Sequence, residues 1–260
     1  MDRLSIATEM PDVLKPFDKK ELEYVAQTLS SEAANPKDVL QGCTVYDPIN
    51  LWRWEGFELW VGGSKHFKTL TAPKGSGKDV TGYIWALSKI ENTIKGMSPI
   101  FIFLTVPNSI TDPKGALRCL LCTLICEISE HVISVPPEKM AESGIFGGQF
   151  VRKYIQRNYH LQDGQQSNAG GDGGNDDEIE SLIELLNALQ HCEFEATYTE
   201  ETYSGNKRVK YVYIVVVDGI MKALEDAGPN YWVNLYEALQ NTLWSKMNGY
   251  TLFIEEKHDA

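Results

Sequence analysis

The sequence predicts an α/β fold in which helices sandwich a mainly parallel sheet. Two runs, Pro99–Val106 (PIFIFLTV) and Val209–Val217 (VKYVYIVVV), are almost continuously apolar. Strands buried on both faces of a parallel sheet have this composition. Segments with apolar residues at helical spacing separate the strand-like runs, as in βαβ units. The crossovers between such strands are expected to be right-handed.

The amino-terminal part is predicted to be helical and rich in aromatic residues. Asp18-Lys19-Lys20-Glu21 has the arrangement of a capping box and precedes an amphipathic run, which predicts a helix. Val45–Trp60 contains five aromatic residues, which we interpret as core or as a contact between lobes; stacking on a nucleic-acid or nucleotide base is the alternative. We therefore expect residues 1–62 to form a segment that packs on a main domain at 63–260.

The main domain begins with a short predicted strand, Phe67–Thr71, that runs into a glycine loop. Helical spacing then follows at Val80–Ile94, and Tyr250–Ile254 predicts a last strand. Further helices are predicted at Gly115–His131, around Phe150–Arg157, from Asp177 to Leu189 and from Trp232 to Leu243, the last closed by Asn248-Gly249.

Residues 162–177 (QDGQQSNAGGDGGNDD) contain almost nothing that could enter a core. This composition predicts a flexible, acidic, solvated insertion. A lid over phosphate groups is the alternative, but the segment has no arginine to serve one.

The overall charge disfavours two classes of partner. The 260 residues carry a formal net charge of −12, which repels nucleic-acid backbones and anionic membranes. The densest basic cluster, Lys207–Lys210, is short and reads as a solvated lead-in to a strand. Direct nucleic-acid binding is therefore not expected, whereas a protein partner or self-association remains open.

No segment predicts a membrane span or a targeting signal. The longest apolar candidate, Leu117–Ile128, is too short and contains Arg118 and Glu127. The first residues lack the apolar stretch of a secretory signal. We expect an intracellular protein, and a cytoplasmic one in the first instance.

The five cysteines do not form the pattern of a secreted disulfide framework. Three of them share one face of a predicted helix, where a metal site is one interpretation and a buried apolar face is the favoured one. The cysteines are Cys43, Cys119, Cys122, Cys126 and Cys192.

The glycine loop carries the most specific chemistry in the sequence. Gly75 and Gly77 have no Cβ, so the backbone can turn its amides toward a phosphate group. The following helix adds its unpaired amino-terminal amides, and Lys78 adds a positive charge that reaches the outer phosphates. The predicted phosphate-binding residues are Ala72, Pro73, Lys74, Gly75, Ser76, Gly77, Lys78, Asp79 and Val80.

This loop resembles the Walker A motif G-x-x-x-x-G-K-[ST] of P-loop NTPases, with two departures. Ala72 replaces the first glycine, and Asp79 replaces the hydroxyl residue that ligates magnesium. A carboxylate can also ligate Mg²⁺, although it brings negative charge close to the phosphates. The stretch also resembles the Lys-x-x-Gly-Lys-Asp loop of some P-loop kinases, such as the animal-type phosphomevalonate kinases and phage deoxynucleotide kinases.

A second motif, at the carboxyl end of a predicted strand, supports the same interpretation as the glycine loop. The Val209–Val217 run delivers Asp218 at its carboxyl end, where ligands of open α/β sheets bind. Asp218 looks like a Walker B aspartate, which orients the magnesium shell; a turn or helix cap before Gly219 is the structural alternative. We therefore expect Lys78 and Asp218 as catalytic residues, and Asp79 and Asp218 as metal ligands.

The order of these elements is similar to the additional-strand class of P-loop NTPases, including its STAND and NACHT branches. The resemblance implies a P-loop NTPase-like fold over about Phe67 to Ile254. The sequence departs from this class at Gly219, where many members have a catalytic glutamate, and at residues 220–222, where NACHT-like proteins are acidic. No arginine finger is evident, and the sequence predicts no role for Glu255 after the last strand. We expect that the sheet is completed either by the segment Glu58–Val61 or by a part of a longer protein.

Three functions follow as hypotheses. The first is a regulatory or assembly NTPase that binds ATP, or else GTP, with Mg²⁺, and has weak or partner-assisted hydrolysis. The second is a small-molecule or nucleotide kinase, for which only Arg152 and Arg157 could form a lid-like arginine pair. The third is a structural or interaction subunit with a relic P-loop fold.

Overall fold

The computed structural model describes residues 19–30, 35–42, 56–94, 97–107, 110–129, 175–189, 195–198, 207–245 and 248–257. The helices are α1 (Lys19–Ser30), α2 (Pro36–Gly42), α3 (Phe57–Gly62), α4 (Lys78–Glu91), α5 (Pro113–Ser129), α8 (Asn175–Ala188), α9 (Ile220–Ala227) and α10 (Pro229–Leu239), which continues as the π-helical turn η3 (Gln240–Trp244). The strands are β1 (Phe67–Ala72), β2 (Met97–Thr105), β3 (Glu195–Tyr198), β4 (Lys207–Asp218) and β5 (Tyr250–Glu256).

Four parallel strands form the centre of the sheet in the order β1-β5-β4-β2, and β3 pairs antiparallel with the start of β4. The predicted α/β fold with a mainly parallel sheet is therefore confirmed. Along β2 and β4 the register runs from Met97 opposite Lys210 to Thr105 opposite Asp218. The last strand in the chain, β5, lies between β1 and β4, so both strands that carry predicted site residues flank it.

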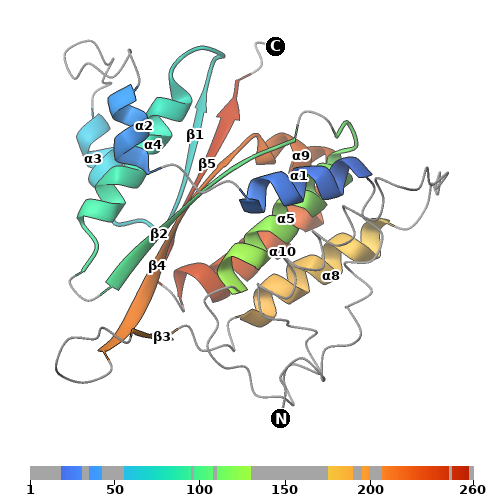
Figure 1. Ribbon diagram of the computed structural model, residues 1–260. Helices are drawn as coiled ribbons and strands as arrows, with labels where there is room; N and C mark the ends of the chain where they lie inside the picture. The colour runs from blue at the N-terminus through green and yellow to red at the C-terminus, as the bar shows by residue number, and fades with distance from the viewer. Residues whose placement is uncertain are drawn as a thin grey trace.

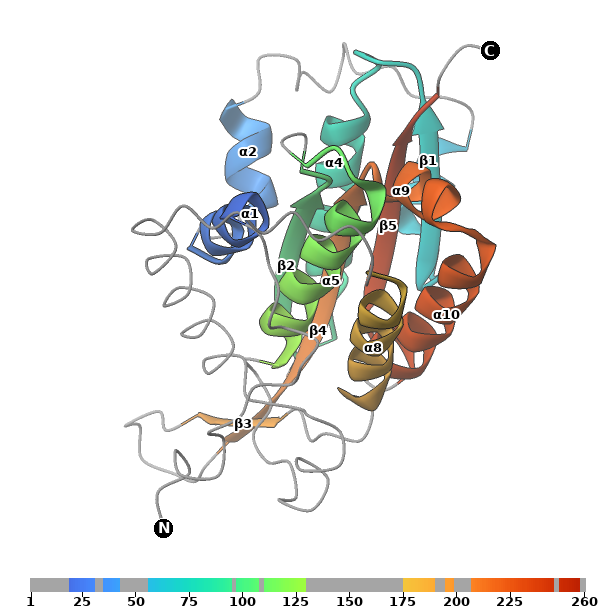
Figure 2. The same cartoon turned by 90° about the vertical axis from the view of Figure 1, so that its right-hand side faces the viewer.

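Helices cover both faces of this sheet (Figure 1). One face carries α2, α3 and α4, and the other carries α5, α9, α10 and α8, with α1 packed outside α5 (Figures 1 and 2). Side chains of a strand alternate between the faces. In β4 the even-numbered residues from Val212 to Val216 join a core with Trp85 of α4, whereas the odd-numbered ones from Tyr213 to Val217 join the larger core on the α5 side.

The helix predictions hold where the structure describes the chain. Helix α5 begins two residues before the predicted Gly115, and α4 begins at the predicted loop lysine. The α5 cysteines Cys119, Cys122 and Cys126 are buried in the core cluster, so their interpretation as an apolar core face is confirmed. The expectation that Glu58–Val61 completes the sheet is wrong, because these residues lie in α3. The region around Phe150–Arg157, the insertion up to residue 174, Cys43 and Cys192 lie outside the described residues.

Helix α1 is held on α5 by a buried ion pair. The Arg118 guanidinium donates to the carboxylate of Glu21, and the two residues are 7% and 3% exposed. The hydroxyl of Tyr24, one turn further along α1, donates to the carbonyl of Thr105 at the end of β2. Together these contacts join α1 both to α5 and to the carboxyl end of the sheet.

Candidate functional site

The glycine loop connects β1 to α4 at the carboxyl end of the sheet. Gly75 and Gly77 have φ angles of 74° and 81°, in the left-handed region that favours glycine. A Cβ placed on either residue would meet no atom within 4 Å, so the loop leaves open space beside its backbone. The amide of Ser76 donates to the carbonyl of Pro73 at 3.2 Å, which closes a turn at the start of the loop.

The first turn of α4 is available to an anion. Gly77 is the residue before the helix and provides no side chain to cap the amino-terminal amides. These amides, together with the helix dipole, attract negative charge. The Lys78 ammonium lies back over the loop, 3.3 Å from the carbonyl oxygen of Pro73, where it can turn toward a ligand. Asp79 is exposed in the same turn.

Asp218 lies opposite this turn. It is an even-numbered residue of β4, so its side chain points to the α4 face of the sheet. Burial raises the pKa of Asp218, and the negative charge of Asp79 raises it further, whereas Lys78 lowers it. The structure therefore brings the loop residues and the strand aspartate within electrostatic reach of each other.

The backbone conformation at position 219 favours glycine over the glutamate that many additional-strand NTPases have there. The φ angle of Gly219 is 80°, and a Cβ at this position would lie 3.2 Å from Cγ2 of Val106. Its amide donates to the carbonyl of Ile254 at 2.8 Å, which fixes the turn against β5. A side chain at position 219 would combine left-handed backbone strain with a close contact. The turn into α9 therefore disfavours any side chain, and with it a catalytic glutamate, at this place.

Glu255 has a structural role that the sequence did not reveal. Its carboxylate accepts the amide of Met221 in the first turn of α9. Burial raises the pKa of Glu255 to about 7, and the nearby charge of Asp218 contributes to the rise, although the bond from Met221 opposes it. As an odd-numbered residue of β5, like the buried Phe253, Glu255 lies on the α9 side of the sheet.

Glu256 is the acidic residue of β5 that shares a face with Asp218. Even-numbered Leu252 and Ile254 pack on the α4 side, which places Glu256 on that side too. Its charge is one of the causes that raise the pKa of Asp218. Glu256 also pairs with Ala72 in the strand register, and the next amide, that of Lys257, donates to the Ala72 carbonyl at 3.0 Å. Strand alternation was the signal that could have distinguished Glu256 from Glu255.

The residues present suit a magnesium ion that arrives with phosphate groups. Within the described part of the chain no group of three or more His, Cys, Asp or Glu side chains is arranged to hold a metal by itself. Asp79 and Asp218 supply two carboxylates, and the negative charge of Asp79 adds to burial in raising the pKa of Asp218. A divalent cation would relieve this repulsion, and Mg²⁺ in such sites takes one or two carboxylates plus substrate phosphate and water.

None of the described helices is long and apolar enough to cross a membrane. Comparisons of the chain with protein-family models, with curated proteins and with solved structures found no match.

Proposed function

We propose that this chain binds a nucleoside triphosphate, ATP in preference to GTP, at the carboxyl end of its sheet. The observation that carries the proposal is the open glycine loop, with two left-handed glycines and an uncapped α4, facing Asp218 across the sheet. The loop amides and Lys78 would hold the phosphates, and Asp79 and Asp218 would hold Mg²⁺. The magnesium ion would neutralise phosphate charge and shield the two carboxylates from it.

The strand order supports the same proposal. β5 lies between the strand that ends in the loop and the strand that ends in Asp218. The resemblance to the additional-strand class implies that Tyr250–Ile254, which forms most of β5, takes the position of the sensor strand. The amide of Lys257, directly after β5, donates to the carbonyl of Ala72, and the amide of Gly219 donates to the carbonyl of Ile254 in β5. Both halves of the proposed site are therefore bonded to β5 or to its end.

The proposed activity is that of a regulatory or assembly NTPase with low intrinsic turnover. Gly219 occupies the place of a catalytic glutamate, and Glu255 is engaged by the amide of Met221. Binding therefore requires only groups that face the loop, whereas rapid hydrolysis needs a base positioned on a water molecule.

Isothermal titration calorimetry with Mg²⁺ and each triphosphate tests the proposal. We expect saturable binding at micromolar or lower concentration, and a loss of at least about tenfold in affinity for Lys78→Ala, since a charge-assisted contact to phosphate is removed. Lys37→Ala is the matched control, because Lys37 is an exposed lysine in the first turn of another helix, α2. Absence of binding to the parent chain would leave the relic-fold hypothesis.

The kinase hypothesis keeps the Gly-Lys-Asp loop as its support, whereas Arg152 and Arg157 lie outside the described residues. Phosphoryl transfer from ATP to a panel of small acceptors separates it from the NTPase. Tight binding without transfer to any acceptor favours the regulatory function.

A further inference from the structure

Two lysines are buried next to each other near the amino ends of β1 and β5, away from the glycine loop. Lys68 of β1 is 8% exposed, and Lys89 near the end of α4 is 5% exposed. The positive charge of Lys68 is one cause that lowers the pKa of Lys89 to about 8, after burial itself. Lys65, on the loop before β1, adds a third positive charge beside Lys68.

The neighbours of both ammonium groups are neutral. Lys68 donates to the carbonyl of Trp60 and lies 5.1 Å from the centre of the Trp60 ring. Lys89 donates to the carbonyl of Gly63 at 2.5 Å and lies 5.2 Å from the centre of the Tyr250 ring. Over the described ranges, the structure places no carboxylate within 4 Å of either nitrogen.

Capping of α3 accounts for only part of this arrangement. The two carbonyls lie at the carboxyl end of α3, where positive charge is favourable. Each ammonium has three N–H donors, and the carbonyl that it binds uses one of them. Among the described residues no carboxylate balances these two like charges, which is costly, and an anion that accepts the remaining donors would remove the cost.

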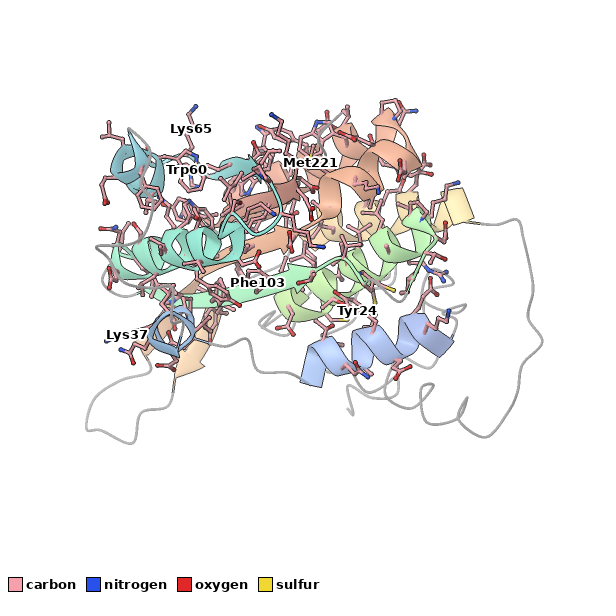
Figure 3. All side chains as sticks on the ribbon, turned by 90° about the horizontal axis from the view of Figure 1, so that it is seen from above. Tyr24, Lys37, Trp60, Lys65, Phe103 and Met221 are labelled. Carbon is pink, nitrogen blue, oxygen red and sulfur yellow. The ribbon has the colours of Figure 1, made fainter. Side chains whose placement is uncertain are left out.

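We propose that Lys68 and Lys89, with Lys65 at the rim, form a second anion site that binds a phosphate group. A phosphate group carries enough negative charge to balance both buried ammoniums, and its oxygens accept their free donors. The rim is accessible: Ser64 and Lys65 are exposed, and Lys65 extends outward from the same flank as Trp60 (Figure 3). The aromatic faces of Trp60 and Tyr250 leave the ammonium donors without competing acceptors.

The experiment is a phosphate titration in the Lys78→Ala background, which removes the lysine of the glycine loop. Inorganic phosphate is the first probe and phenyl phosphate the second, so that free phosphate and a phosphate ester are distinguished; chloride at equal ionic strength is the reference. Thermal unfolding and amide NMR shifts are followed together. We expect phosphate to raise the melting temperature and to shift the amides of Gly63 and His66, with affinity at least about tenfold weaker in Lys89→Gln.

Lys222→Gln on the exposed side of α9 is the control and should retain the parent response. If Lys89→Gln does not fold, the NMR titration of the Lys78→Ala protein decides: shifts at Gly63 and His66 support the site, and shifts confined to the glycine loop, or none, overturn it. An equal response of Lys89→Gln and its parent also overturns the proposal. Because the glycine-loop lysine is absent throughout, the outcome does not depend on triphosphate binding at that loop.

Discussion

At the scale of single residues, charge placement distinguishes the two glutamates at the end of β5. Glu255 and Glu256 are adjacent in sequence, but the first caps α9 and the second shares a face with Asp218. The sequence alone predicted Lys78, Asp79 and Asp218 as one site, because each follows a motif with local meaning. It could not assign Glu255, because the amide that binds it comes from Met221, 34 positions away.

The raised pKa of Glu255 predicts how stability depends on pH. The native state holds this proton up to about pH 7, whereas the unfolded state releases it near 4.5. The native state thus binds more protons in this window, so the free energy of unfolding contributed by Glu255 is full below pH 4.5 and is lost as pH rises through 7. Glu255→Gln keeps an oxygen for the Met221 amide and removes the titration.

We therefore expect the free energy of unfolding of Glu255→Gln, relative to that of the parent, to rise by about 1–2 kcal/mol from pH 5 to pH 8. This figure is reduced for solvent screening, because Glu255 is half-buried. Urea unfolding of both proteins at pH 5 and at pH 8 measures this difference in the free energy of unfolding. Glu237→Gln, exposed on α10, should follow the parent. Parallel curves for Glu255→Gln and the parent would contradict the assignment.

At the scale of elements, the sequence predicts strands and long helices better than the short elements that join them. Runs such as Val209–Val217 are apolar enough to be identified locally, and β4 extends this run by only three residues. By contrast, Glu58–Val61, one of two expected ways of completing the sheet, lies in α3, whose six residues are too few to show a clear period. Its helical state depends on burial of Phe57 and on the lysines that donate to its last carbonyls.

The packing of α1 on α5 gives the prediction at this scale. Removal of one partner from the buried Glu21–Arg118 pair leaves a buried charge, so Glu21→Leu or Arg118→Met should each lower the free energy of unfolding by about 3–5 kcal/mol. The double replacement Glu21→Leu with Arg118→Met should cost less than either single change, because no charge remains buried. Chemical denaturation of the four proteins in a double-mutant cycle measures the coupling. Additive single effects would show that the pair is not coupled.

At the scale of the whole molecule, two groups of basic residues lie on the same face of the sheet but at opposite ends of β1. Ala72, where the glycine loop begins, and Lys68 of the lysine cluster are four residues apart on β1, roughly 13 Å along the strand. Strand alternation places both on the α4 face, at opposite ends of α4. No local pattern predicts this layout, because it depends on the strand order β1-β5-β4-β2 and on the return of α4 across the sheet.

This layout predicts two separate footprints in hydrogen–deuterium exchange. Magnesium–ATP should slow exchange at the start of α4, at the Gly219 turn and at Lys257, because hydrogen bonds from Gly219 and Lys257 join the proposed site to β5 and β1. In the Lys78→Ala protein, phosphate should instead slow exchange around Gly63 and His66, where the His66 ring already donates to the carbonyl of Gly249. Since stabilisation of the native state by a ligand also slows global opening, the comparison uses amides that exchange by local opening. Identical footprints for the two ligands would mean that both occupy one site, and the lysine cluster would then serve only to hold α3 on the sheet.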